Sequence, residues 1–195
     1  MHTALDVLDF VISDDQRATH EVARAPREQL LLRHDPAQED LEIGLFVDEL
    51  TLRSLAGPLS EDHLPEYLLA VEGVSHFVYA VVRAQAQRRF SALELELQAE
   101  MDKYLLVLLG TWREGAAPPA DLRARLFHKV RFHDDLSDEE RGRYHTANAA
   151  AADFAASLEH RFVRHRAVDD MLAEMRLFYR LDCNGKLDHI ARRAA

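Results

Sequence analysis

The sequence predicts a mainly α-helical protein with one small β-hairpin, and three observations carry this prediction. Apolar residues recur every three or four positions along most of the chain, which is the period of an amphipathic helix. Two Ser-x-x-Glu stretches, starting at Ser91 and Ser137, have the capping-box pattern that begins a helix. Residues 28–47 instead contain short apolar runs, one of which alternates with other residues as a strand does. We therefore expect a multi-helix bundle with a small sheet near residues 28–47.

The predicted bundle is built around two long helices, at about 60–87 and 91–110. Each helix carries a continuous apolar stripe, and only a short turn near Arg89 separates them. A connection this short forces neighbouring helices to run antiparallel. We therefore expect these two helices to form an antiparallel hairpin on which the others pack.

The predicted β-hairpin joins two apolar runs through a polar loop of about six residues between His34 and Asp40. A lone two-stranded hairpin is marginally stable in water, so it must pack on helices or extend a partner's sheet. Further helices are expected over residues 48–56, 121–132, 137–165, 168–180 and 186–193, the last of them after a turn at 182–185. The chain is expected to be a single domain, 1–195, with a subdomain at 1–57 made of an N-terminal helix and the β-hairpin, and a helical bundle at 58–195.

Composition limits the class of protein. The chain has 195 residues, is 48% hydrophobic and 30% charged, and carries a net charge of −10. An acidic chain repels phosphate backbones, so nucleic acid is an unlikely partner. The acidity is explained by solubility, and the alternative is attraction to a basic partner. The one cysteine cannot form an internal disulfide, and the N-terminal residues lack the basic start of a signal peptide. We expect a cytoplasmic protein that does not bind a membrane.

The first candidate metal site lies on the two central helices. Glu72 and His76 are one helical turn apart, and in an antiparallel hairpin they would lie near Glu100. Carboxylates and imidazoles on facing helices form the metal sites of carboxylate-bridged di-metal bundles. Those bundles use Glu-x-x-His, whereas this spacing is Glu-x-x-x-His and occurs once. The alternative is a hydrogen-bonded or surface histidine beside a solvated acidic face.

The second candidate metal site is the pair His133 and Asp134, within a histidine-rich segment. A His-Asp pair is part of the metal centre of helical phosphohydrolases, and His128 and Asp153 could supply the further ligands. However, His133 is expected to lie in a loop. The alternative is that these histidines are simply exposed.

Two weaker candidates lie toward the C-terminus. Arg161, Arg164 and Arg166 form a basic group that could bind an anion or an acidic partner, although nearby acids favour solvated ion pairs instead. Cys183 could act as a nucleophile with His189 as its base, but nothing in the sequence orients the histidine.

No pattern reaches the specificity of an active site, so we expect a non-catalytic accessory protein that acts through helical surfaces. The expected surface is a helical groove or the small-residue stripe Ala149, Ala152 and Ala156, and the partner is another protein or a second copy of the chain. No cofactor is expected. The alternative is a metal-dependent helical enzyme, a hydrolase or a di-metal oxidoreductase, which would require a divalent metal.

Overall fold

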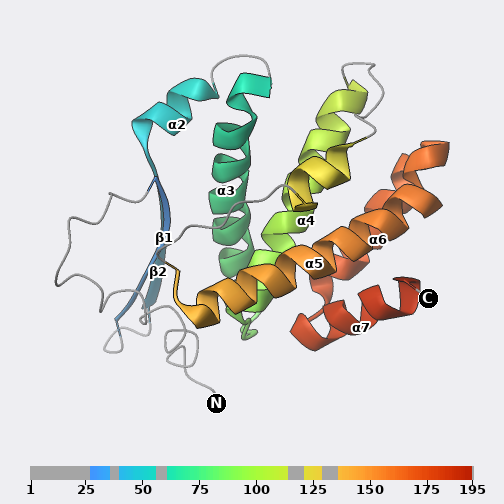
Figure 1. The fold of residues 1–195 in the computed structure, drawn as a ribbon. Helices are drawn as coiled ribbons and strands as arrows, with labels where there is room; N and C mark the ends of the chain where they lie inside the picture. Colours follow the sequence, from blue (N-terminus) through green and yellow to red (C-terminus); the bar gives the residue numbers. More distant parts are fainter. Residues whose placement is uncertain (1–26, 36–39, 56–60, 114–120, 129–135, 195) are drawn as a thin grey trace. The chain divides into compact units, whose positions relative to one another are not determined.

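The computed structural model describes residues 27–35, 40–55, 61–113, 121–128 and 136–194. As predicted, these residues form a mainly α-helical protein with one two-stranded antiparallel sheet (Figure 1). The chain divides into two compact units, residues 1–91 and 92–195. We describe each unit separately. The single domain with a subdomain boundary near residue 57 stays a prediction.

The first unit begins with the β-hairpin. Strands β1 (Glu28–Asp35) and β2 (Asp40–Val47) pair in a register that runs from Glu28 opposite Val47 to Asp35 opposite Asp40. This confirms the predicted hairpin, but the strands extend further toward the turn than the polar sequence suggested. Cross-strand hydrogen bonding therefore overrides the weak strand preference of the aspartates at the strand ends.

The helices of the first unit follow directly. Helix α2 (Glu49–Ser54) starts at Asp48, whose carboxylate accepts hydrogen bonds from the backbone N–H of Thr51 (2.6 Å) and from Nε of Arg27 (3.0 Å). The backbone hydrogen bond from Thr51 is the largest influence on the pKa of Asp48, which is held below its usual value. A 3-10 turn, η2 (Glu61–His63), leads into α3 (Leu64–Gln85), and both strands and α2 pack on α3 (Figure 1).

Among the described helices, α3 alone is long and apolar enough to cross a membrane. The mean hydropathy of its most apolar window is 1.2, and 44% of that window is buried inside the protein. Core helices of soluble proteins have the same properties. Length and composition therefore do not distinguish a membrane helix from a core helix here.

The second unit is entirely helical in its described part. Its elements are α4 (Ala92–Arg113), the π-helical turn η3 (Ala124–His128), α5 (Asp138–Arg161), the 3-10 turn η4 (Val163–His165), α6 (Val168–Arg180) and α7 (Cys183–Ala194). Helix α5 packs against both α4 and α7 (Figure 1). Its core contains fully buried aromatic and aliphatic side chains from α4, α5 and α6, among them Leu97, Tyr104, Phe154, Met171 and Phe178.

The two long helices predicted at 60–87 and 91–110 are present as α3 and α4. They belong to different units, because the chain divides between Ser91 and Ala92. Their antiparallel packing against each other therefore stays a prediction.

The start of α5 confirms the predicted capping box. The side-chain oxygen of Ser137 accepts from the backbone N–H of Glu140 (3.3 Å), and the Glu140 carboxylate accepts from the backbone N–H of Ser137 (2.7 Å). The helix ends at Arg161, earlier than the predicted His165. The chain then tightens into η4 and leaves it through Arg166, which has the left-handed φ of 53°.

The predicted turn at 182–185 is wrong in detail, because α7 already begins at Cys183. The Asp182 carboxylate accepts a hydrogen bond from the backbone N–H of Gly185 (2.7 Å). This is the geometry of a helix N-cap, in which a side-chain oxygen satisfies a donor of the first turn. Asp182 therefore starts a helix in a stretch whose Asp, Asn and Gly residues are typical of a turn.

Candidate functional site

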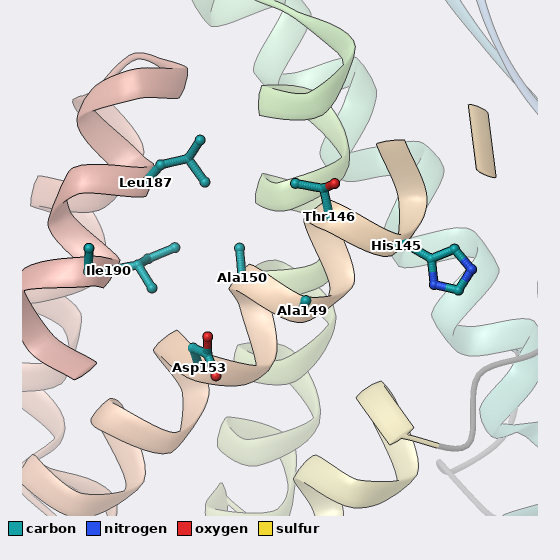
Figure 2. A pocket seen from close by; sticks show the side chains of 8 residues that line it. His145, Thr146, Ala149, Ala150, Asp153, Leu187 and Ile190 are labelled. Carbon is teal, nitrogen blue, oxygen red and sulfur yellow. The ribbon is translucent and has the colours of Figure 1, made fainter. Parts of the chain in front are cut away.

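The second unit has an open groove between α5 and α7, with a volume of about 510 Å³ (Figure 2). Side chains from the middle of α5 form one side and side chains from α7 the other. Figure 2 shows Leu187 and Ile190 projecting from α7 into the space beside α5. The lining residues are His145, Thr146, Ala149, Ala150, Asp153, Leu187, Ile190 and Ala191.

The α5 side of the groove is shallow because its residues are small. Ala149 and Ala150 contribute only methyl groups, and the Thr146 hydroxyl donates to the Gly142 carbonyl of its own helix (2.8 Å). Of the predicted small-residue stripe, Ala149 lines the groove, whereas Ala152 is buried inside the unit. Ala152 of the stripe therefore packs in the core, whereas Ala149 faces the groove.

Two ionisable residues lie at the rim. Asp153 follows Ala149 by one helical turn and is exposed. The His145 ring, which is also exposed, points away from α7 in Figure 2. Among the lining residues, Asp153 is therefore the one carboxylate that can meet a ligand in this groove.

The α7 wall is held in place by a polar cluster that we call the Glu174 clasp. Glu174 on α6 accepts hydrogen bonds from Arg161 on α5 (Nη1 to Oε1, 3.0 Å) and from Nε2 of His189 on α7 (2.9 Å). It also forms an ion pair with Arg193 of α7. One carboxylate, whose side chain is 9% exposed, thus ties three helices together.

The pKa values of both Glu174 and His189 are lowered in the Glu174 clasp. Burial is the largest influence on the Glu174 carboxyl and raises its pKa, but the hydrogen bonds and charges of Arg161, Arg193 and His189 outweigh it and lower the pKa overall. Burial also lowers the pKa of His189, and Arg193 adds to this effect against the attraction of Glu174. His189 Nε2 faces the Glu174 carboxylate, which can only accept, so Nε2 carries the proton of this hydrogen bond.

A second polar cluster fixes the start of α7 on α4. The Glu94 carboxylate accepts from the backbone N–H of Cys183 (3.1 Å), and Gln98 Oε1 accepts from Nζ of Lys186 (2.7 Å). The Gln98 amide nitrogen donates onward to Asp102 (2.8 Å). Lys186 is fully buried, with its ammonium 5.0 Å from the centre of the Phe178 ring.

Sequence reasoning missed both clusters. Glu94, Gln98 and Asp102 repeat every four residues on α4, which is a detectable stripe, but polar stripes are usually solvated. Lys186 resembles a surface lysine, and nothing local indicates that its ammonium is buried. The missing information is which helix faces this stripe.

The predicted metal residues are only partly described. Glu72 and His76 share α3 in the first unit, whereas Glu100 lies on α4 in the second and forms an ion pair with Lys103 (2.7 Å). The set of three thus involves both units and stays a prediction. His133 and Asp134 lie outside the described residues, so the second metal site also stays a prediction.

The two weaker predicted sites lie within the described residues, and the basic group as an anion or partner site stays a prediction. Arg161 is engaged in the Glu174 clasp, whereas Arg164 and Arg166 are exposed on the turn that follows α5. Cys183 and His189 are six residues apart on one helix, about 9 Å along its axis. That separation is too long for a nucleophile and its base to share a proton.

Comparison with known proteins assigns no function, so the proposed function rests on this geometry. No family model, no curated protein and no solved structure matches the chain.

Proposed function

We propose that this protein is a soluble, non-catalytic accessory protein of the cytoplasm whose α5–α7 groove binds an apolar helical segment of a partner protein. The observation that carries the proposal is the groove itself, with an alanine floor facing Leu187 and Ile190. Small floor residues let another helix approach closely, and large apolar side chains opposite them supply contact area. This is the helix-in-groove mode of recognition.

The charges of the groove favour one kind of segment. Asp153 is an exposed carboxylate at the rim, and the whole chain carries a net charge of −10. A Lys or Arg one turn away from the apolar anchors of the partner would pair with Asp153. The preferred partner segment is therefore an amphipathic helix with a basic residue beside its apolar stripe.

The buried ionisable groups of the second unit support a non-catalytic function. In the Glu174 clasp and the Lys186–Gln98 pair, the ionisable groups bond to protein groups, and none of these residues lines the groove. Catalysis would require such groups to reach a bound substrate.

A photoreactive side chain at Thr146, in extracts of the source cells, tests this function. We expect a discrete protein adduct that disappears when Ala150→Trp fills the groove. The matched control is Ala173→Trp, at an exposed alanine on α6, which should leave the adduct unchanged. The adducted segment, made as a peptide, should bind Asp153→Lys about tenfold more weakly than the unsubstituted protein. An adduct that persists in Ala150→Trp, or a small molecule found in the groove by native mass spectrometry, would contradict the proposal.

The metal-dependent alternative rests on Glu72 and His76, one turn apart on α3, with His76 buried. It is distinguished by metal analysis of the purified protein before and after chelation. Stoichiometric iron, manganese or zinc that is lost in His76→Ala would replace the non-catalytic proposal with a metalloenzyme.

A further inference from the structure

A cluster of basic side chains lies at the C-terminal end of α5, in the second unit. The stretch from 160 to 168 contains five basic residues and no acid. All five are exposed, in a chain whose net charge is −10. We call these five residues the basic corner: His160, Arg161, Arg164, His165 and Arg166.

The turn through the basic corner is fixed by backbone hydrogen bonds. The N–H groups of Arg166 and Ala167 donate to the carbonyl oxygens of Val163 (3.1 Å) and Phe162 (3.0 Å). Arg166 has a left-handed φ of 53°, a conformation in which glycine is favoured over residues with a side chain. The backbone alone would therefore favour glycine here, which points to a use for the arginine side chain.

Arg164 and Arg166 form no ion pair with another residue in the described part of the chain. Asp169 and Asp170 follow the corner and are exposed in the first turn of α6, where the positive end of the helix dipole favours acids. Neither acid pairs with the two arginines. The solvated ion pairs expected from the sequence are therefore not observed for these two arginines among the described residues.

Other acids beside the corner are already engaged. Glu159 pairs with Arg123 (Oε2 to Nε, 3.2 Å), and Oε1 of Glu174 accepts a hydrogen bond from Arg161. Arg193 contacts the same oxygen of Glu174, so the basic end of α7 lies beside the corner. The contact with Glu174 uses one of the five N–H groups of Arg161. These acids therefore leave Arg164 and Arg166 available to a partner.

We propose that the basic corner binds a short segment of a partner protein that is rich in Asp or Glu. A guanidinium group can donate two parallel hydrogen bonds to one carboxylate, so Arg164 and Arg166 can each hold one acidic side chain. No lysine occurs between Lys129 and Lys186, so the corner uses the basic side chain that suits a planar acceptor with two oxygens. Arginine clusters recognise acidic motifs in this way.

The charge of the whole chain favours a short segment over a long polyanion. At physiological ionic strength, charges are screened over about 8 Å, so a segment bound at the corner responds mainly to the nearby arginines. A nucleic acid or an anionic membrane extends past the corner and meets the rest of a chain with a net charge of −10. The basic corner shares no residue with the lining of the α5–α7 groove, so this proposal is independent of the function proposed above.

Fluorescence polarisation of the full chain with a labelled acidic peptide measures this binding. The probe is a fluorescein-labelled peptide of about eight glutamates, and its control is a glutamine peptide of the same length. We expect a dissociation constant on the order of 100 µM for the glutamate peptide in a low-salt buffer. Binding should weaken about tenfold in a high-salt buffer, because the contact is exposed to solvent.

Two substitutions locate the binding surface. Arg166→Gly removes the side chain where the backbone favours glycine, so the melting temperature should not fall, whereas binding should weaken about fivefold. Arg164→Gln should weaken binding by a similar factor. The matched control is Arg176→Gln, which removes the same charge at an exposed position on α6 outside the corner. It should bind the glutamate peptide as the unsubstituted protein does.

Three results would overturn the proposal. The first is equal binding of the glutamate and glutamine peptides. The second is a loss of binding in Arg176→Gln as large as that in Arg166→Gly, which would show that only the total charge matters. The third is a single-stranded oligonucleotide that binds more tightly than the glutamate peptide and is released by Arg166→Gly, which would assign the corner to nucleic acid.

Discussion

The two units of this protein both bury ionisable groups, but they bond them differently. In the first unit, Arg83 donates to Tyr79 of its own helix, whereas in the second unit Glu94, Lys186 and His189 are buried and bond to neighbouring helices. The first unit contains most of the large apolar side chains that are exposed in the described part of the chain, including Leu31, Phe46 and Val78. The second unit thus joins its helices through buried polar bonds, and the first unit exposes more large apolar side chains.

The buried charged groups of the second unit join its helices. Glu94, Glu174 and Lys186 each bond to a side chain or backbone group on another helix. Such bonds require a particular helix arrangement, because any other arrangement leaves a charge unpaired in the interior. These bonds position α7, the helix that carries Leu187 and Ile190, and so they also position one wall of the groove.

The largest expected effect comes from removing the centre of the Glu174 clasp. Glu174→Ala leaves Arg161, His189 and Arg193 without their shared acceptor, and we expect the free energy of unfolding to fall by about 3 kcal/mol. Urea unfolding measures this change. Asp170→Ala, at an exposed acid on the same helix, should alter it by less than about 0.5 kcal/mol. Equal effects of the two substitutions would mean that the clasp does not stabilise the unit.

The next effect concerns Lys186 and Gln98. Gln98→Leu deprives a buried ammonium of an oxygen at 2.7 Å, and should reduce the free energy of unfolding by about 2 kcal/mol. Lys186→Met in the same chain should restore part of this loss, because both polar groups are then replaced by apolar ones. A double-mutant cycle measures the coupling. Additive effects of the two substitutions would contradict a direct interaction between Gln98 and Lys186.

The clasp also predicts acid sensitivity in two stages. The folded-state pKa of His189 is lowered from 6.5, so its contribution to stability is complete above about pH 6.5 and is lost below it, as the pH falls through the folded-state pKa. The pKa of Glu174 is lowered from 4.5, so its contribution is complete above about pH 4.5 and is lost at lower pH. Unfolding free energies measured from about pH 8 to about pH 3 should show the first decrease shrink in His189→Gln, but not in the exposed His145→Gln.

The smallest effect is expected on the exposed face of the hairpin in the first unit. Leu31→Ser should change the free energy of unfolding by less than about 0.5 kcal/mol, because Leu31 is 49% exposed. Leu97→Ala, at a fully buried position of the second unit, should cost about 3 kcal/mol. A large loss of unfolding free energy in Leu31→Ser would show that this face of the hairpin is covered. The first unit would then expose less apolar surface than described above.

Much of the fold could be predicted because its signals are local. Apolar periodicity identified the long helices, and Ser137 with Glu140 marked the start of α5 within four residues of sequence. The hairpin at 28–47 was also found from alternation. The errors lie where a few atoms decide the outcome, as at Asp182, whose carboxylate caps α7 where composition indicates a turn.

The sequence predicted that a helical groove or the small-residue stripe would be the functional surface, but not which helix forms the second wall of the groove. The sequence shows an alanine stripe on α5, and one of its residues, Ala149, lines the groove. It does not show that Leu187 and Ile190 approach from a helix about 40 positions later, since that depends on bonds made by Glu94, Gln98 and Glu174. Long-range pairing of polar groups has no periodic signature, so single-sequence reasoning could not recover it.

The bond between Glu94 and the start of α7 also orders events during synthesis. Its two partners are 89 positions apart in the chain. At about 5 to 20 residues per second, a ribosome needs roughly 5 to 18 s to make that stretch. Until then the polar stripe of α4 has water in place of Cys183 and Lys186. The second unit therefore cannot complete its core until the start of α7 has been made, and chaperones have several seconds in which to bind the unfinished unit.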